Sequence, residues 1–204
     1  MKRKNVLKRW SGMGLLTLVF MAILSGCGQP EVETYTPAPL DENLTYYAVI
    51  EIEEYGAITV ELNQSEAPIT CANFVELADG GFYDGLTFHR IIEDFMMQGG
   101  APKEAEAQAI VGEFASNGIE NNLAHTRGAI SMARTKVKNS ASSQFFIVHA
   151  DSPHLDGDYA AFGYVVEGIE VVDLVCQSSN PVDGNGTIAE EDQPVIKTIT
   201  IKKE

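Results

Sequence analysis

The sequence predicts a mainly β domain, a closed antiparallel barrel of eight strands capped by two α-helices. Short segments in which apolar and polar residues alternate recur along the chain, and this alternation is the two-residue period of a pleated strand. Only two segments show the three- or four-residue apolar spacing of an amphipathic helix. Many short strands with so few helices favour a closed barrel over a parallel sheet covered by helices.

A hairpin and a helix are expected first. Residues 48–52 and 57–62 flank a Glu-Glu-Tyr-Gly turn, which is typical of two paired strands. A helix then begins at Pro68, because proline is tolerated in the first helical turn, and the pair Gly80-Gly81 ends it. Its apolar positions at helical spacing are Phe74, Leu77 and Ala78. This spacing indicates a helix that covers an apolar surface.

The remaining elements follow the same patterns. Further strands are expected at residues 86–92, 95–98, 128–133, 144–148 and 162–166. Residues 169–175 have the spacing of a second helix, and residues 195–201 form a closing strand. Together with the hairpin these segments make the eight strands of the predicted barrel.

The N-terminus has the features of a secretory signal. The basic residues Lys2, Arg3, Lys4, Lys8 and Arg9 precede an apolar run over residues 12–24. That run is short for a membrane-spanning helix and has the length of a signal-peptide core. It ends in Leu24-Ser25-Gly26-Cys27, which resembles a bacterial lipobox. We therefore expect removal of residues 1–26, diacylglycerol on Cys27, and a protein anchored to the bacterial cell membrane, facing outside the cytoplasm. The alternatives are an uncleaved anchor or a chance cysteine.

Residues 27–45 are expected to be an extended, acidic and proline-containing tether, and residues 46–204 the folded domain. The full chain has 14 basic and 29 acidic residues. Cleavage before Cys27 would remove five basic residues and no acidic one, which leaves a net charge of −20. Such a charge repels phosphate backbones and anionic headgroups, so it argues against a nucleic-acid partner and leaves the anchoring to lipid.

Residues 87–100 hold the most informative motif. Arg90 lies in an apolar strand, where a charge is costly to bury without a hydrogen-bonded role. Phe88-His89-Arg90 precedes Phe95-Met96-Met97-Gln98, and Gly128 to Arg134, Ser142 to Val148, Leu155-Asp156-Gly157 and Ala161-Phe162-Gly163 follow. Together these segments resemble the signature of the cyclophilins, the peptidyl-prolyl cis/trans isomerases, from about Tyr46 to the C-terminus. The resemblance implies the cyclophilin barrel and isomerase activity (EC 5.2.1.8).

The resemblance also implies roles for single residues. Arg90 matches the catalytic arginine, and Gln98 matches the glutamine that bonds the substrate backbone and helps to orient that arginine. The apolar pocket for the proline ring is matched by Phe95, Met96, Phe146 and Leu155, with Phe95 also counted among the catalytic residues. Ala133 and Arg134 match the strand edge that pairs with the peptide, and Gln144 is a further substrate-binding candidate. The competing interpretations are a structural ion pair for Arg90 and ordinary core for the apolar residues.

Two positions of the pocket depart from the family pattern. His154 stands where eukaryotic cyclophilins carry the tryptophan that supports cyclosporin binding, so only weak binding of that drug is expected. Tyr159 stands where a histidine usually lines the pocket. The spacing of the four histidines does not resemble a metal site, and bond rotation needs no metal or cofactor.

The expected function is isomerisation of X–Pro bonds in unfolded or folding exported proteins, by a monomer at the cell surface. The reaction needs a hydrogen-bond donor aimed at the twisted amide and no covalent step, and Arg90 could supply the donor. The alternative is a non-catalytic proline-peptide binding module or chaperone on the cell surface. Loss of activity with retention of peptide binding on Arg90→Ala would separate the two.

Overall fold

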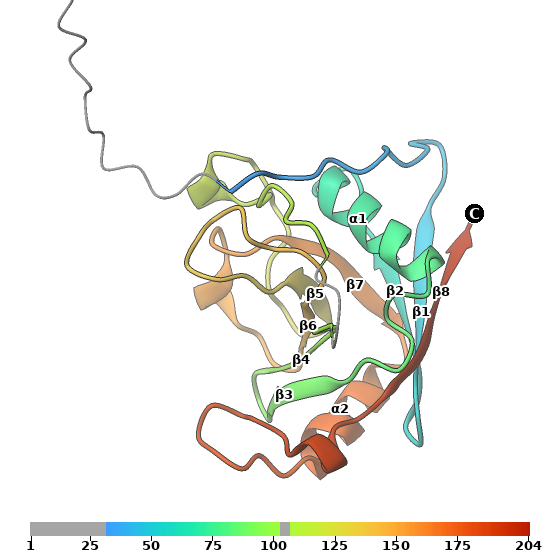
Figure 1. The fold of residues 1–204 in the computed structure, drawn as a ribbon, viewed down its shortest axis with the longest axis vertical. Coiled ribbons are helices and arrows are strands. Elements are labelled where there is room, and N and C mark those ends of the chain that lie inside the picture. Colours follow the sequence, from blue (N-terminus) through green and yellow to red (C-terminus); the bar gives the residue numbers. More distant parts are fainter. Residues whose placement is uncertain (1–31, 103–106) are drawn as a thin grey trace, which may run out of the picture.

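A computed structural model describes residues 32–102 and 107–204 and shows one antiparallel sheet of eight strands (Figure 1). In sequence order the strands are β1 (Tyr46–Ile52), β2 (Gly56–Leu62), β3 (Phe88–Ile92), β4 (Met96–Gly99), β5 (Ala129–Met132), β6 (Phe145–Val148), β7 (Ala161–Glu167) and β8 (Ile196–Lys203). Their order in the sheet is β3-β4-β6-β5-β7-β2-β1-β8. The eight strands expected from the alternation are confirmed, with bounds shifted by a few residues.

The two expected helices are also present, as α1 (Pro68–Asp79) and α2 (Ile169–Ser178). Pro68 occupies the start of α1, whose preceding residue, Ala67, gives no side-chain cap. The buried carboxylate of Glu113 supplies it instead, accepting hydrogen bonds from the backbone N–H groups of Ile69 and Thr70 at 3.0 and 2.7 Å. A carboxylate at this end of a helix satisfies free N–H groups and complements the helix dipole.

The core fills the concave side of the sheet. Along β1 buried and half-buried residues alternate, so one face of the strand points into the core. Five aromatic rings meet there at centroid distances of 5.2 to 5.9 Å, those of Phe74, Tyr83, Phe88, Phe145 and Phe162. Phe74 comes from α1, so the helix is fixed to the sheet by aromatic packing.

The sheet is curled but open, and the prediction of a closed barrel is wrong in this respect. Where closure would occur, Thr87 and Val195 form one isolated antiparallel bridge. Further along, the loop after α2 occupies the outer edge of β3. Ile91 donates its N–H to the carbonyl of Gly186 at 2.8 Å, and Ile188 donates to that of His89 at 3.0 Å. Because these backbone groups of β3 are bonded to the loop, they cannot pair with β8.

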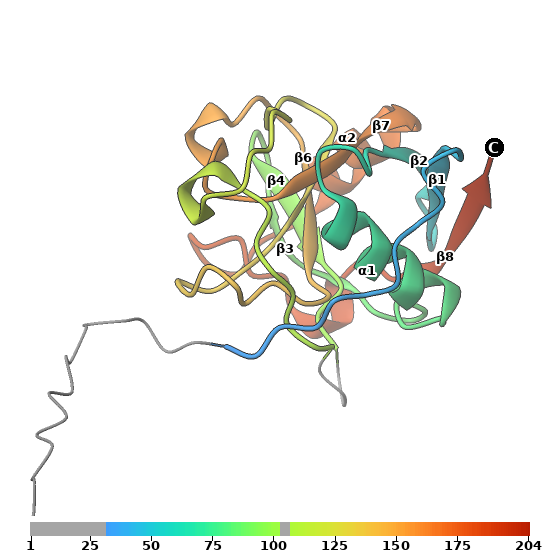
Figure 2. The ribbon, with the colours of Figure 1, turned by 90° about the horizontal axis from the view of Figure 1, so that it is seen from above.

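The described part of the expected tether is extended but not free. Residues 32–45 run along α1, as both views show (Figures 1 and 2). The hydroxyl of Tyr35 donates to the carboxylate of Glu76 on α1 at 2.9 Å, and Tyr35 pairs with Ile110 in a parallel bridge. Thr45 exchanges two backbone hydrogen bonds with Glu204. The described part of this extended segment thus contacts the domain, because its aromatic and backbone groups find partners there.

The predicted signal peptide and Cys27 lie outside the described residues. Within the described ranges, the helices are too short and too polar for any of them to cross a membrane.

Candidate active site

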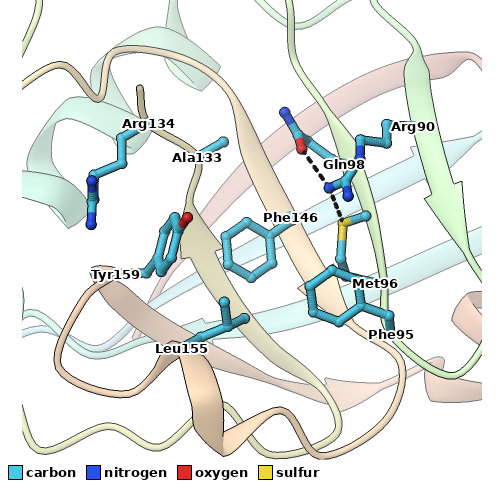
Figure 3. Close-up of a pocket in the computed structure, with 9 residues that line it drawn as sticks. All are labelled: Arg90, Phe95, Met96, Gln98, Ala133, Arg134, Phe146, Leu155 and Tyr159. Carbon is cyan, nitrogen blue, oxygen red and sulfur yellow. Dashed lines mark hydrogen bonds between the residues drawn. The ribbon is translucent and has the colours of Figure 1, made fainter. Parts of the chain in front are cut away.

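A pocket of about 180 Å³ lies beside an apolar cluster that is separate from the main core (Figure 3). Its lining residues are Arg90, Phe95, Met96, Gln98, Ala133, Arg134, Phe146, Leu155 and Tyr159. All nine were predicted from the sequence as catalytic or substrate-binding residues. They come from β3, β4, β6, the end of β5 and the segment around the short 3-10 helix Pro153–Leu155.

Strand register brings the polar and apolar parts of the pocket together. Arg90 of β3 lies opposite Gln98 of β4, and Gln98 lies opposite Phe146 of β6. Directly opposed residues on neighbouring strands project to the same side of a sheet. The three side chains therefore form a row across three strands, with a cationic donor at one end and an aromatic ring at the other.

The floor of the pocket is an apolar cluster separate from the main core. It contains the buried side chains of Met96, Phe146 and Leu155, with Phe95 and Tyr159 packed against them. Because side chains alternate along a strand, Met97 and Phe145 point into the core while Met96 and Phe146 face the pocket. These residues are buried as core residues are, but they form a cluster of their own and line the pocket.

Arg90 is held by neutral acceptors. Its Nε donates to the backbone carbonyl of Asn185 at 2.7 Å, while Nη1 makes longer contacts to Gln98 Oε1 at 3.4 Å and Met96 Sδ at 3.7 Å (Figure 3). In the described residues no carboxylate lies within ion-pair distance of Arg90. The structural ion pair considered for it is thus not formed, and its charge remains available to a ligand.

Gln144 and His154 lie behind the pocket lining, in contact with Gln98 and Phe95. Gln144 Oε1 accepts a hydrogen bond from Gln98 Nε2 at 3.0 Å, which directs the Gln98 carbonyl oxygen toward Arg90. The ring of His154 packs on that of Phe95 with centroids 5.4 Å apart. These two predicted residues support the lining of the pocket and do not form it.

The far wall of the pocket is a stack of rings and a cation. The guanidinium of Arg134 lies between the rings of Phe114 and Tyr159, 4.9 and 4.7 Å from their centroids. It also donates to the backbone carbonyl of Asp158 from Nε at 2.9 Å and Nη2 at 2.7 Å. Tyr159 in turn packs edge-on against Phe146 of the pocket floor, with ring centroids 5.9 Å apart. The side chain of Arg134 therefore helps to form the pocket wall.

A buried polar network supports the floor from below. His125 donates through its Nδ1–H to the Asp156 carboxylate at 2.8 Å, and its Nε2 forms a hydrogen bond with the Ser131 hydroxyl at 2.9 Å. Its ring stacks on that of Phe146 with centroids 6.0 Å apart. Burial lowers the pKa of His125, and this outweighs the opposing effect of the Asp156 carboxylate. The sequence gave no sign that Ser131, Asn185 or Phe114 lies at the site.

The arrangement combines an apolar cavity with directed hydrogen-bond donors. Among the residues the structure describes, no group of three or more His, Cys, Asp or Glu side chains could hold a metal ion. The turn at Asp183 turns its carboxylate inward onto the backbone N–H groups of Asn185 and Thr187. The chemistry that this pocket can perform is recognition of an apolar ring and polarisation of a neighbouring amide.

Comparisons with known proteins agree with this geometry. The family model described as cyclophilin type peptidyl-prolyl cis-trans isomerase/CLD matches residues 47–203. Peptidyl-prolyl cis-trans isomerase A of Dickeya dadantii is 44% identical over 127 residues, which are 60% of this chain and 67% of that protein. A peptidyl-prolyl cis-trans isomerase of Helicobacter pylori is 38% identical over 148 residues, 72% of this chain and 90% of the other.

A solved structure has the same fold. The crystal structure of a cyclophilin type peptidyl-prolyl cis-trans isomerase from Cryptosporidium parvum superposes with a TM-score of 0.68 at 29% identity. The match covers 78% of this chain and 99% of that one. The same Cryptosporidium protein was also crystallised in the presence of the dipeptide Ala-Pro.

Proposed function

Because the chain belongs to the cyclophilin family and is a peptidyl-prolyl cis-trans isomerase, we propose that Arg90 supplies its catalytic hydrogen-bond donor. Rotation about an X–Pro bond crosses a barrier of ~18–20 kcal/mol that arises from amide resonance. In the twisted state the prolyl nitrogen regains its lone pair. A donor aimed at that nitrogen stabilises the transition state and not the planar ground state. A stabilisation of ~7 kcal/mol would accelerate rotation about 10⁵-fold.

The pocket floor would hold the proline ring. The side chains of Met96, Phe146 and Leu155 are almost fully buried and present an apolar surface beside Arg90. Burial of a ring against such a surface removes it from water and fixes the amide with respect to the guanidinium. Gln98, held by Gln144, could at the same time bond the peptide backbone.

The single observation that best supports the mechanism is the set of neutral partners of Arg90. In a chain with 29 acidic residues, its contacts are a backbone carbonyl, an amide oxygen and a thioether sulfur. A carboxylate partner would neutralise the positive charge that stabilises the transition state. Neutral acceptors orient the guanidinium and leave its charge intact. Arg90 is thus preorganised for a donor role.

The test compares Arg90→Ala and Arg90→Lys with the purified full chain, using NMR exchange on an Ala-Pro-Phe peptide. We expect kcat/KM to fall roughly 10²- to 10³-fold in Arg90→Ala, the usual effect of removing one transition-state donor. Arg90→Lys should recover only part of this, because a lysine cannot reproduce the fork of the guanidinium. The matched control is Arg127→Ala, which removes an arginine paired with Asp173 outside the pocket.

The competing function, a binding module without catalysis, makes a different prediction. In that case the wild-type chain binds the peptide while the exchange rate stays at its uncatalysed value. A wild-type rate retained by Arg90→Ala would instead leave the enzyme intact and remove Arg90 from its mechanism.

We also propose that the enzyme acts on exported proteins as a lipid-anchored monomer outside the cytoplasmic membrane. The basic cluster, the short apolar run and the lipobox-like ending at Cys27 support this location. Two or more acyl chains would hold the domain firmly, because each buried methylene contributes ~0.8 kcal/mol. Mass spectrometry of the mature N-terminus tests the modification. A Cys27→Ala variant that stays in the membrane fraction would argue against lipid anchoring.

Weak cyclosporin binding is proposed from His154. Its ring packs on Phe95 and lies outside the pocket lining, so it offers the drug less apolar surface than a tryptophan indole. Isothermal titration with cyclosporin of the wild type and of His154→Trp would test this, with tighter binding expected in the variant.

A further inference from the structure

The loop that follows α2 lies against β3 (Figure 1). Arg90 and Thr187 form an isolated antiparallel bridge, and Ile91 donates its N–H to the carbonyl of Gly186 at 2.8 Å. The carbonyl of Asn185 accepts the 2.7 Å hydrogen bond from Arg90 Nε. This hydrogen bond is shorter than the contacts of Arg90 Nη1 with Gln98 and Met96, which are 3.4 and 3.7 Å. The loop is therefore the principal support of the guanidinium.

One carboxylate fixes the shape of this loop. Asp183 accepts three hydrogen bonds, from the N–H of Asn185 at 2.9 Å, the N–H of Thr187 at 3.0 Å and the hydroxyl of Thr187 at 3.0 Å. The loop closes further through the N–H of Val182, which donates to the carbonyl of Thr187 at 2.8 Å. The carbonyl of Asn185, which is the acceptor for Arg90, shares a peptide plane with the N–H of Gly186, and this N–H donates to the carbonyl of Asp183 at 3.3 Å. The bonds of Asp183 therefore hold the loop on both sides of Asn185.

The loop also fits too closely to move sideways. Gly186 has φ +84°, in the left-handed region, and a Cβ there would lie 2.4 Å from Ile92 Cγ1 and 2.7 Å from the carbonyl oxygen of Ile91. Only a glycine can lie this close to β3. The carbonyl of Asn185 is consequently held between the Asp183 turn on one side and β3 on the other.

We propose that Asp183 is a positioning residue for the isomerase reaction, which acts through the Asn185 carbonyl to aim the Arg90 guanidinium at the substrate amide. The inference rests on the proposed role of Arg90. Removing the Asp183 carboxylate frees two backbone N–H groups and a hydroxyl, so the loop can rotate the carbonyl away from Nε. The guanidinium then keeps its charge but loses its direction, and misplacement of a reacting group by about 1 Å can cost up to 10²-fold in rate.

The experiment measures kcat and KM by NMR exchange for the full chain and for Asp183→Ala, Asp183→Asn, Thr187→Val and Asp192→Ala. We expect kcat to fall about five- to twentyfold in Asp183→Ala, with KM changed less than about twofold, because the apolar floor is untouched. Asp183→Asn should recover most of the rate, since its amide oxygen can still accept both backbone N–H groups. Thr187→Val removes one of the three bonds and should lose less. Asp192→Ala removes an exposed carboxylate that does not line the pocket and should behave as wild type.

A second measurement distinguishes aiming from general damage to the fold. The Nε–Hε NMR signal of Arg90, assigned by its absence from Arg90→Ala, reports the hydrogen bond to Asn185 directly. It should shift or broaden in Asp183→Ala and keep its wild-type position in Asp192→Ala. A wild-type kcat in Asp183→Ala, or a lower kcat with an unmoved Arg90 signal, would overturn the inference. If Arg90→Ala itself keeps the wild-type rate, the proposed mechanism fails first. If Arg90→Ala has a reduced kcat while Asp183→Ala keeps the wild-type kcat, the role of Arg90 stands and only the positioning role of Asp183 is refuted.

Discussion

The stack of Phe114, Arg134 and Tyr159 predicts that substrate binding depends on the shape of the Arg134 side chain. The guanidinium lies 4.9 Å from one ring centroid and 4.7 Å from the other, so it holds Tyr159 as one wall of the pocket. Arg134→Ala removes this support. Arg134→Lys keeps the positive charge but loses the flat group that fits between two rings. We therefore expect both variants to weaken peptide binding to a similar extent.

The magnitude follows from the two cation–π contacts. Each contributes ~0.5–1 kcal/mol at a partly exposed site, which gives about 1–2 kcal/mol for the stack. The hydrogen bonds to Asp158 add little, because water can replace them once the side chain is gone. Without this stabilisation the ring of Tyr159 is less well ordered, and the peptide must order it again on binding. The peptide Kd should therefore rise roughly 5- to 30-fold, since 1.4 kcal/mol is a factor of ten. The value of kcat should change little, because Arg90 and its partners lie across the pocket.

The assay is an NMR titration of the Ala-Pro-Phe peptide into the wild type, Arg134→Ala, Arg134→Lys and the control Lys197→Ala. Lys197 is an exposed residue of β8 that pairs with Glu51, so its loss tests the effect of one charge far from the pocket. A wild-type Kd in Arg134→Lys would refute the reasoning, because charge alone would then explain the contribution of Arg134. A matching loss of kcat would also contradict it.

Two further predictions concern stability. Glu113→Ala leaves two helix N–H groups and the Thr70 hydroxyl without their acceptor, so urea unfolding should show a loss of about 3–5 kcal/mol, whereas Glu113→Gln should lose less because one acceptor oxygen remains. A free energy of unfolding for Glu113→Ala within about 1 kcal/mol of the wild-type value would contradict this, because the loss of one ordinary hydrogen bond could explain it. Burial lowers the folded-state pKa of His125 below 6.5, so the unfolded chain takes up the proton first and the free energy of unfolding should decrease as pH falls below about 6.5 toward that lowered pKa. His89 is shifted in the same direction, so the slope in His125→Gln should be reduced and not abolished, and an unchanged slope would count against the argument.

Local patterns in the sequence predicted most of the secondary structure. Short alternating or continuous apolar runs between turn residues predicted the strands, and Pro68 with Gly80 placed the ends of α1, because these signals act within a few residues. The pocket lining was predicted from the resemblance to the cyclophilin motifs and not from such local patterns. Strand register then explains why Arg90, Gln98 and Phe146, which lie in separate strands, form one row.

Contacts between distant segments could not be predicted in this way. The outer edge of β3 is occupied by a loop almost a hundred residues later in the chain, and this contact decides that the sheet stays open. Tyr35 bonds to Glu76 across 41 positions, so the sequence alone predicted an extended tether without showing that it contacts α1. The acceptor for Arg90 Nε is a backbone carbonyl, a group that every residue carries. No residue type could have marked Asn185 as part of the site.

The choice of acceptor also explains why the site needs so many supporting contacts. A carboxylate attracts a guanidinium over several ångströms and tolerates movement, but it neutralises the charge. A neutral carbonyl leaves the charge of Arg90 available, but it orients the side chain only while the carbonyl itself is held in place. The turn at Asp183 and the close fit of Gly186 provide that constraint. Isomerisation requires no covalent step, so in the proposed mechanism the rate depends on the direction of one donor. The rigidity of a loop that lies far from Arg90 in the sequence would then contribute to the rate.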